Sequence, residues 1–199
     1  MEKMEKMEKM EKMEKMEESK NQNSNYYDAI WILSDINRDL KTARDNYNNY
    51  FKFEEAGVID KMTQENLGSL KRLTFFSLIL SLCKFKEAFE HYNDEFKLLD
   101  EQLINALNDV DKKITDKRMR AFRNKYICHI FDKSGNKVRP LTVDKASNRL
   151  KEIIGETDVE QEEFLTWIYK ERDESCVTNA IYNAIVAFQE KSGAYYRFK

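Results

Sequence analysis

Residues 63–89 read TQENLGSLKRLTFFSLILSLCKFKEAF and carry the strongest folding signal in the chain. Apolar residues recur there every three or four positions, which is the spacing of an α-helix that buries one face. The expected buried row consists of Leu67, Leu70, Leu73, Phe76, Leu80 and Cys83, flanked by Phe75, Ile79, Leu82 and Phe89. Thr63 is suited to cap the N-terminus of this helix, because its hydroxyl can accept a backbone hydrogen bond. We expect this most apolar helix to lie at the centre of the fold.

Helical spacing also appears on both sides of this stretch. The rows are Ile30, Leu33, Ile36 and Leu40 in residues 26–54; Leu103, Leu107, Val110, Ile114, Phe122, Tyr126 and Ile130; and Phe164, Ile168, Ile181, Ile185 and Phe188 in residues 159–191. A shorter helix is expected from Thr142 or Asp144 to Gly155, and the glycines at 57 and 193 are suited to end helices. Continuity through residues 172–175 stays open. The prediction is an all-α, up-and-down bundle of about five helices.

The length of 199 residues suits one domain, predicted to span residues 25–199. Residues 1–16 are five Met-Glu-Lys triplets closed by Met16, and residues 1–24 are interpreted as a low-complexity tail and polar linker. The longest apolar block, residues 73–85, is interrupted by polar residues and too short to cross a bilayer, so we expect a cytoplasmic protein without a membrane partner. Three dispersed cysteines predict reduced thiols in or near the core.

Positive charge is concentrated in residues 112–139. This segment holds ten Lys or Arg residues and two acids, or about +8, whereas the whole chain has a formal charge of −2. A cationic patch favours a polyanionic partner such as RNA, because neutralised phosphates release counterions. The candidate RNA-binding residues are Lys117, Arg120, Lys125, Lys133, Lys137 and Arg139.

The same segment contains Arg123, Asn124 and His129, which together suit phosphodiester cleavage. A histidine can move protons near neutral pH. An arginine can hold a phosphate through its planar fork of donors, and the Asn124 amide can orient the phosphate or the ribose. The second histidine, His91, is interpreted as an exposed helix position. No metal or cofactor is predicted, because two histidines without clustered carboxylates do not form a typical metal site.

Arg123 and His129 are six residues apart, which places them about 120° apart around an ideal helix. Three arrangements could bring them together. The helix could break near the motif, Arg123 could reach around it, or two copies of the chain could meet at a two-fold axis and form a composite site. The last arrangement predicts a homodimer.

An Arg-Asn pair followed by four residues and a histidine, late in a helix of an all-α domain, resembles the Arg-(Asn/Asp/His)-x4–6-His signature of the HEPN superfamily. The run from Phe122 to Asp132, followed by residues 139–142 and a short helix, is similar to the abortive-infection branch of that superfamily. The resemblance implies a helical bundle, a homodimer with facing motifs, and metal-independent endoribonuclease activity that leaves a 2′,3′-cyclic phosphate. It also implies a toxin or phage-defence role with an antitoxin or defence partner. Some members have a modifiable tyrosine two residues after the histidine, where this chain has Phe131.

The expected function is therefore an endoribonuclease in which His129 is the general acid or base, Arg123 stabilises the phosphorane and Asn124 positions it. Two alternatives remain. The first is a catalytically inactive helical module that binds RNA or another protein through the same basic surface. The second is a structural protein in which the basic residues form a solvated face.

Overall fold

The computed structural model describes residues 2–58, 60, 63–127, 131–132, 139–140, 142–171 and 175–193. Their side chains are described from residue 24 onward, except at positions 64, 131, 132, 139, 140 and 143. The helices are α1 (Glu2–Glu55), α2 (Gln64–His91), α3 (Asn93–Phe96), α4 (Glu101–Asp116), α5 (Met119–Phe122), the π-helix η1 (Arg123–Ile127), α6 (Val143–Ile154), α7 (Asp158–Ile168) and α8 (Val177–Ser192). The expected all-α class is confirmed, although the described residues form more helices than the five expected.

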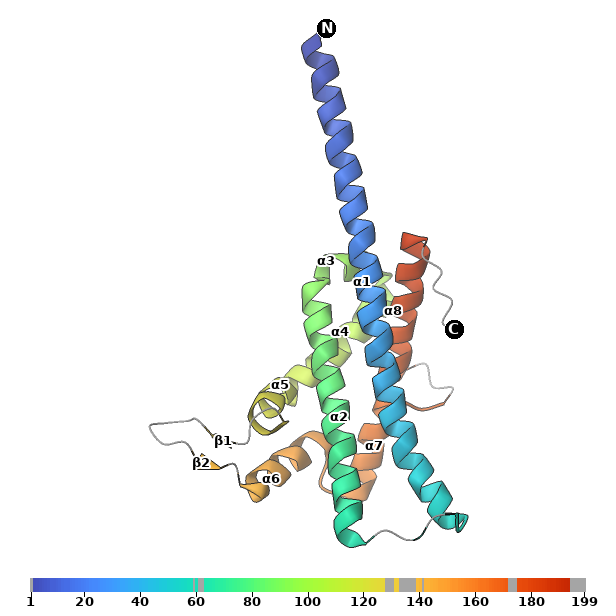
Figure 1. Ribbon diagram of the computed structural model, residues 1–199, viewed down its shortest axis with the longest axis vertical. Coiled ribbons are helices and arrows are strands. Elements are labelled where there is room, and N and C mark those ends of the chain that lie inside the picture. The colour runs from blue at the N-terminus through green and yellow to red at the C-terminus, as the bar shows by residue number, and fades with distance from the viewer. Residues whose placement is uncertain are drawn as a thin grey trace.

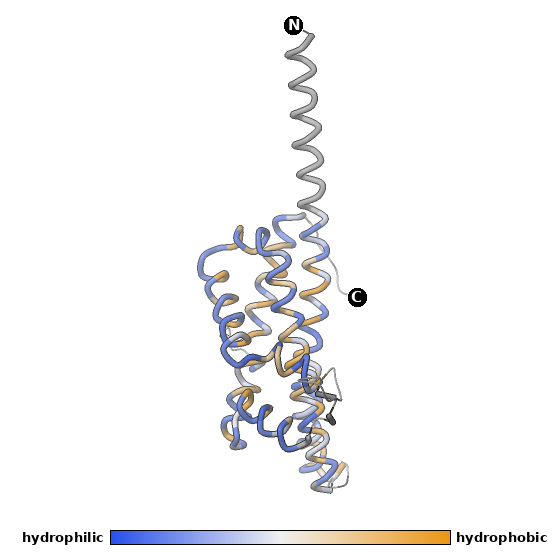
Figure 2. The backbone as a smooth tube through the Cα atoms, turned by 90° about the vertical axis from the view of Figure 1, so that its left-hand side faces the viewer, coloured by the Kyte–Doolittle hydropathy of each residue, from blue (hydrophilic) through white to orange (hydrophobic). Residues whose placement is uncertain are grey.

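The core lies where α1, α2, α4 and α8 pack along one another (Figure 1). Hydrophobic and hydrophilic residues alternate along these helices, as Figure 2 shows, so each helix can bury one side and expose the other. The helix α7 packs against α1, α6 and α8, while α5 and η1 lie along α2. This arrangement places Arg120 and Arg123 against the exposed side of α2.

The helix α1 carries its apolar row as expected, and Ile30, Leu33, Ile36 and Leu40 are all buried. The helix begins before the apolar pattern that starts near Tyr26, and it runs unbroken from Glu2 through the residues 18–24 that were interpreted as a linker. Residues 2–55 contain no glycine or proline, and glutamate, lysine and glutamine are good helix formers. Polar composition alone therefore did not interrupt the helix.

The helix α2 begins after Thr63 as expected, and the Thr63 side chain accepts a hydrogen bond from the Asn66 N–H at 3.3 Å. The expected buried row was mostly wrong, since Cys83 is its only fully buried member and Leu73 is 63% exposed. The other four members, Leu67, Leu70, Phe76 and Leu80, are half-buried. The buried face instead contains Phe75, Leu78, Ile79, Leu82, Cys83 and Phe85. A helix that is apolar on several sides does not specify its inward face by spacing alone; the packing of α1 against α2 does.

The later helices follow the expected caps. The helix α6 has Thr142 at its N-cap and Gly155 at its C-cap, and α8 ends at Gly193 in the left-handed conformation. The region 159–191 contains parts of two helices, α7 and α8, and the five apolar residues expected to face the core, Phe164, Ile168, Ile181, Ile185 and Phe188, are buried. Two strands, β1 (Phe131–Asp132) and β2 (Arg139–Pro140), pair antiparallel where only a loop was expected.

Two further features concern the described parts of the chain. Cys83 and Cys176 are buried and form no disulfide, in agreement with the expectation of core thiols, whereas Cys128 lies outside the described residues. None of the helices for which the structure gives coordinates is both long enough and apolar enough to cross a membrane.

Candidate nucleic-acid interface

A sharp turn at Arg118 brings the motif onto α2. Arg118 has φ of 50° and ψ of 41°, the left-handed conformation that is uncommon for a residue with a Cβ. After the turn, Met119 and Phe122 are buried and hold α5 on the core. The third apolar pattern was expected to lead into the motif, with a break in the helix as one of the arrangements left open. Its described residues form α4, α5 and η1, and the chain turns at Arg118, where the sequence has no glycine or proline to indicate a break.

Arg123 and Asn124 begin the π-helix η1. Short π-helical segments are rare and often occur at functional sites, since they change the direction of side chains within a helix. His129 lies outside the described residues, as do Cys128 and Ile130. The position of His129 relative to Arg123 therefore remains a prediction.

The guanidinium of Arg123 is fixed from two sides. Its Nη1 donates a hydrogen bond to Glu87 Oε1 of α2 at 2.6 Å, and its Nε donates to Asn124 Oδ1 at 3.0 Å. The Arg123 side chain is only 16% exposed, so this ion pair is shielded from water more than an ordinary surface pair. Asn124 was expected to position the phosphate, and in this structure it contacts the neighbouring arginine.

Arg120 makes a similar contact one turn earlier. Its Nη1 donates to both carboxylate oxygens of Glu90, at 2.9 and 3.1 Å. Glu90 also pairs with Lys86 at 3.2 Å, and Lys86 reaches Asp111 of α4 at 2.5 Å. Burial lowers the pKa of the Lys86 ammonium, but its hydrogen bonds to Asp111 and Glu90 outweigh burial and leave that pKa raised. The carboxylates of Glu87 and Glu90 on α2 thus offset part of the positive charge counted in residues 112–139.

Among the other candidate RNA-binding residues, the structure describes the side chains of Lys117 and Lys125. Lys117 donates from Nζ to the backbone oxygen of Glu152 at 3.0 Å. Lys125 is exposed, with Nζ 5.8 Å from the centre of the Tyr126 ring. Arg139 lies in strand β2, and its side chain, like Lys133 and Lys137, is outside the described part of the chain. Tyr126 is half-buried and packs on Phe122, in agreement with its expected place in the core.

The sequence analysis missed the acidic partners on α2. Glu87 and Glu90 are three positions apart and project from the exposed side of the helix, opposite the buried Leu82 and Phe85. That spacing was a usable signal that the two carboxylates share a face. His91, one position further, is exposed as expected.

A cavity of about 550 Å³ opens beside the π-helix, between α2, η1, α6 and α7. Its apolar wall includes Phe75, Phe76, Tyr126 and Leu150, and its polar edge includes Thr142, Ser147 and Gln161. Three cations, Lys71, Arg72 and Lys151, line it together with Gly68. Its lining includes no described aspartate or glutamate. The cavity is therefore suited to an anion that has an apolar part.

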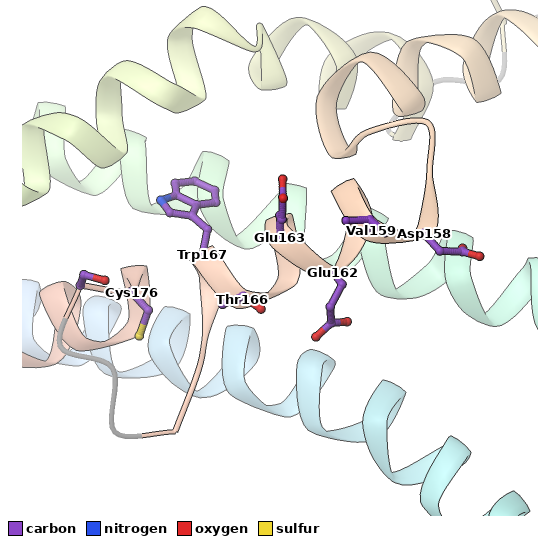
Figure 3. A pocket seen from close by; sticks show the side chains of 8 residues that line it. Asp158, Val159, Glu162, Glu163, Thr166, Trp167 and Cys176 are labelled. Atoms are coloured by element: carbon purple, nitrogen blue, oxygen red, sulfur yellow. The ribbon is translucent and has the colours of Figure 1, made fainter.

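A second hollow of about 680 Å³ lies along α7 and is lined by acids, among them Asp158, Glu162 and Glu163 (Figure 3). Glu162 points toward α1, where Arg44 holds it at 2.5 Å. Trp167 points toward α4, where the Lys113 ammonium lies 3.9 Å from its ring centre, and burial lowers the pKa of that lysine. The carboxylates make this hollow unsuitable for a phosphate group.

Comparison with known proteins supports the fold. No family model and no curated protein matches the chain. A solved structure from the mobile metagenome of V. paracholerae, the integron cassette protein Vpc_cass2, is similar with a TM-score of 0.66 and 19% identity. The match covers 82% of this chain and 95% of that protein. The likeness shows that the helical arrangement occurs in another protein.

Proposed function

We propose that this protein is a metal-independent endoribonuclease, acting as a toxin or phage-defence effector, that cleaves RNA at a composite site between two copies of the chain. The observation that carries the proposal is the fixed arginine of the motif. Arg123 lies on a π-helical turn, with its guanidinium oriented by Glu87 and Asn124. An oriented guanidinium can stabilise phosphorane charge without first losing its conformational freedom.

In this reaction the 2′-oxygen of a ribose attacks the adjacent phosphorus and forms the new P–O bond of a 2′,3′-cyclic phosphate. The bond from phosphorus to the 5′-oxygen of the next nucleotide breaks. His129 takes the proton from the 2′-hydroxyl or delivers a proton to the leaving 5′-oxygen, and the Arg123 guanidinium faces the phosphorane oxygens. Metal ions take no part, so the reaction should proceed in EDTA.

An exposed groove supports the homodimer. Between α1 and α2 a groove of about 570 Å³ is lined by Trp31, Ile32, Lys84 and Glu87 among others. Trp31 is 58% exposed there, and large exposed aromatic side chains are typical anchors of protein interfaces. Because Glu87 lines this groove and also holds Arg123, a second copy bound here would lie beside the motif arginine.

The deciding experiment compares cleavage of cellular RNA in EDTA by the wild-type protein and by His129→Ala, with the 3′ ends of the products mapped. Asn108→Ala is the control, because Asn108 is an exposed polar residue of α4 that lies outside the groove proposed for the dimer. Cyclic-phosphate ends that persist in Asn108→Ala and disappear in His129→Ala are expected. Intact RNA with the wild-type protein would remove the nuclease proposal.

The pairing of Arg120 and Arg123 with Glu90 and Glu87 favours a second candidate function. Cations that already hold carboxylates contribute less to RNA affinity and more to fixing the local structure. A catalytically inactive helical module that binds RNA or a partner protein would use the same surface. Salt-dependent RNA binding without any cleavage, measured in the experiment above, would select this candidate.

A further inference from the structure

The cavity between α2, η1, α6 and α7 is lined in part by residues that follow Arg123 and Asn124 in the sequence. Tyr126 and Ile127, the last two residues of the π-helix, both line it, and they follow Arg123 by three and four positions. A group bound in the cavity would therefore lie next to the turn that carries Arg123. The elements that form its walls can be followed in Figure 1, where α6 and α7 lie beside the first half of α2.

Gly68 gives this cavity an open wall. It lies in the first half of α2, and a Cβ placed on it would meet no described atom within 4 Å. A glycine inside a helix costs about 1 kcal/mol relative to alanine. The protein itself therefore leaves room for a larger side chain at position 68. A ligand that approaches the helix backbone closely would explain why glycine occurs there.

The walls combine aromatic side chains with uncompensated cations. Phe76 and Tyr126 are half-buried, so parts of their rings face the open space. Arg72 and Lys151 are exposed at the edge and have no ion-pair partner among the described residues, whereas Lys71 is held by Asp158 at 2.9 Å. Aromatic rings stack on planar bases, and arginine and lysine bind phosphates.

The volume and the polar groups suit a single nucleotide. Pockets for small ligands commonly span about 300–1,000 Å³ and have mostly apolar walls with a few placed polar groups. This cavity measures about 550 Å³ and offers the side chains of Thr142, Ser147 and Gln161. Hydroxyl and amide groups can donate to and accept from the edge of a base, which allows them to distinguish one base from another.

We propose that this cavity binds one nucleotide, with the base against Phe76 and Tyr126 and the phosphate at Arg72 and Lys151. The nucleotide could belong to the RNA substrate, at a distance from the cleaved bond, or be a free nucleotide that regulates the protein. The first source rests on the proposed ribonuclease function and the second does not. In both cases the recognised chemistry is a planar base joined to a phosphate.

The test uses the full chain and two variants of the cavity. Gly68→Leu fills the open wall, and Ser77→Leu is its control, because residue 77 is exposed on the same helix and does not line the cavity. Lys151→Ala removes a cation, and Lys145→Ala removes an exposed lysine of α6 that lies outside the cavity. Thermal unfolding by circular dichroism checks that every variant folds; Lys151→Ala keeps the test valid if Gly68→Leu does not fold.

Two measurements distinguish the sources. Calorimetric titration with AMP, GMP, CMP and UMP detects a free nucleotide, and the base preference of RNA cleavage detects a nucleotide of the substrate. We expect Gly68→Leu to weaken the affected process about tenfold or more, as loss of base stacking does, with a smaller loss in Lys151→Ala and none in the controls. If Gly68→Leu loses mononucleotide binding and cleaves RNA as the wild type does, the ligand is a free nucleotide. If Gly68→Leu changes the base preference or the KM of cleavage, the ligand is a nucleotide of the RNA substrate.

These measurements distinguish failure of the nucleotide-site proposal from failure of the proposed ribonuclease function. If the protein cleaves no RNA but binds mononucleotides in a way that depends on Gly68, the nucleotide-site proposal stands and the ribonuclease proposal is wrong. Cleavage with unchanged KM and base preference in Gly68→Leu, and no binding of any of the four mononucleotides to the wild-type protein, would retain the nuclease and overturn the nucleotide site. Equal losses in Gly68→Leu and Ser77→Leu would also overturn it.

Discussion

Arg123 Nη1 lies 2.6 Å from Glu87 Oε1, so the arginine of the motif is joined to α2 and not only to its own helical turn. The two residues are 36 positions apart in the chain, and the contact forms only when α5 and η1 pack on α2. Glu87 is therefore a positioning residue for Arg123 in the proposed reaction.

Glu87→Ala should separate binding from cleavage. Removal of a carboxylate from the basic surface should leave RNA affinity unchanged or tighter, because the net charge becomes more positive. Cleavage at saturating RNA should fall about 10- to 100-fold, because a misplaced catalytic group costs roughly that much. Glu87→Gln keeps an acceptor for Arg123 and should retain more activity than Glu87→Ala. The kcat and KM of the three proteins check this, and parallel losses of affinity in both variants would contradict it.

Trp31→Glu should dissociate the proposed homodimer. A charge in the groove beside Glu87 would be buried without a partner on association, which is costly. Analytical ultracentrifugation should show a monomer, and RNA cleavage should be lost with the dimer. Leu98→Glu is the control, because Leu98 is also an exposed apolar residue but does not line this groove. A wild-type protein that sediments as a monomer at all concentrations would contradict the dimer.

Glu162→Ala should lower the free energy of unfolding by more than is expected for a residue as exposed as Glu162. Its partner Arg44 has a side chain that is only 9% exposed, and the Nε and Nη1 atoms of Arg44 have no hydrogen-bond partner among the described residues. Loss of Glu162 would leave a buried charge unpaired. Since Glu162 itself is 57% exposed, we expect about 1–3 kcal/mol, less than for a fully buried pair.

Urea unfolding of three variants tests this prediction. Arg44→Met removes the charge together with its unsatisfied donors and should be close to neutral or stabilising. Asp94→Ala breaks the exposed pair with Lys97 and should cost at most about 0.5 kcal/mol. Equal effects of Glu162→Ala and Asp94→Ala would show that burial of Arg44 does not matter.

Glu160→Gln should reduce the dependence of stability on pH. Hydrogen bonds from Thr157 and Glu156 hold the pKa of the Glu160 carboxyl below its ordinary value, in a capping box at the start of α7. A lowered pKa in the folded state stabilises the protein above the pKa of the unfolded chain, and this contribution is lost as the pH falls through the folded pKa. The unfolding temperatures of wild type and Glu160→Gln should therefore differ near neutral pH and converge in acid. A constant difference would contradict the capping role.

Much of the secondary structure could be predicted because its signals are local. Thr63 precedes α2 and accepts a backbone hydrogen bond through its side chain, while Thr142 precedes α6 without a side-chain cap hydrogen bond. Gly155 and Gly193 follow helices, as expected for residues whose φ angle is free. The row of α1 from Ile30 to Leu40 is buried because one clear apolar stripe allows one inward face. The helix through residues 18–24 could have been anticipated from the absence of helix breakers.

The candidate site could be predicted only in part. Arg123 and Asn124 do lie together, and the basic residues are near them, but the carboxylates of Glu87 and Glu90 come from another helix. Charge counted along one segment ignores the charges that folding brings beside it. The cavity with Gly68, Tyr126 and Lys151 was also missed, because its walls come from parts of the chain far apart in the sequence.

Local sequence signals were sufficient to predict the helical class, the start of α2, both ends of α6 and the buried face of α1. These depend on interactions within a few residues, which a single chain segment contains. Tertiary structure alone decided the rotation of α2 that exposes Leu73, the turn at Arg118, and the pairing of Arg123 with Glu87. In each case several local conformations have similar free energy, and burial and charge pairing between helices stabilise one of them.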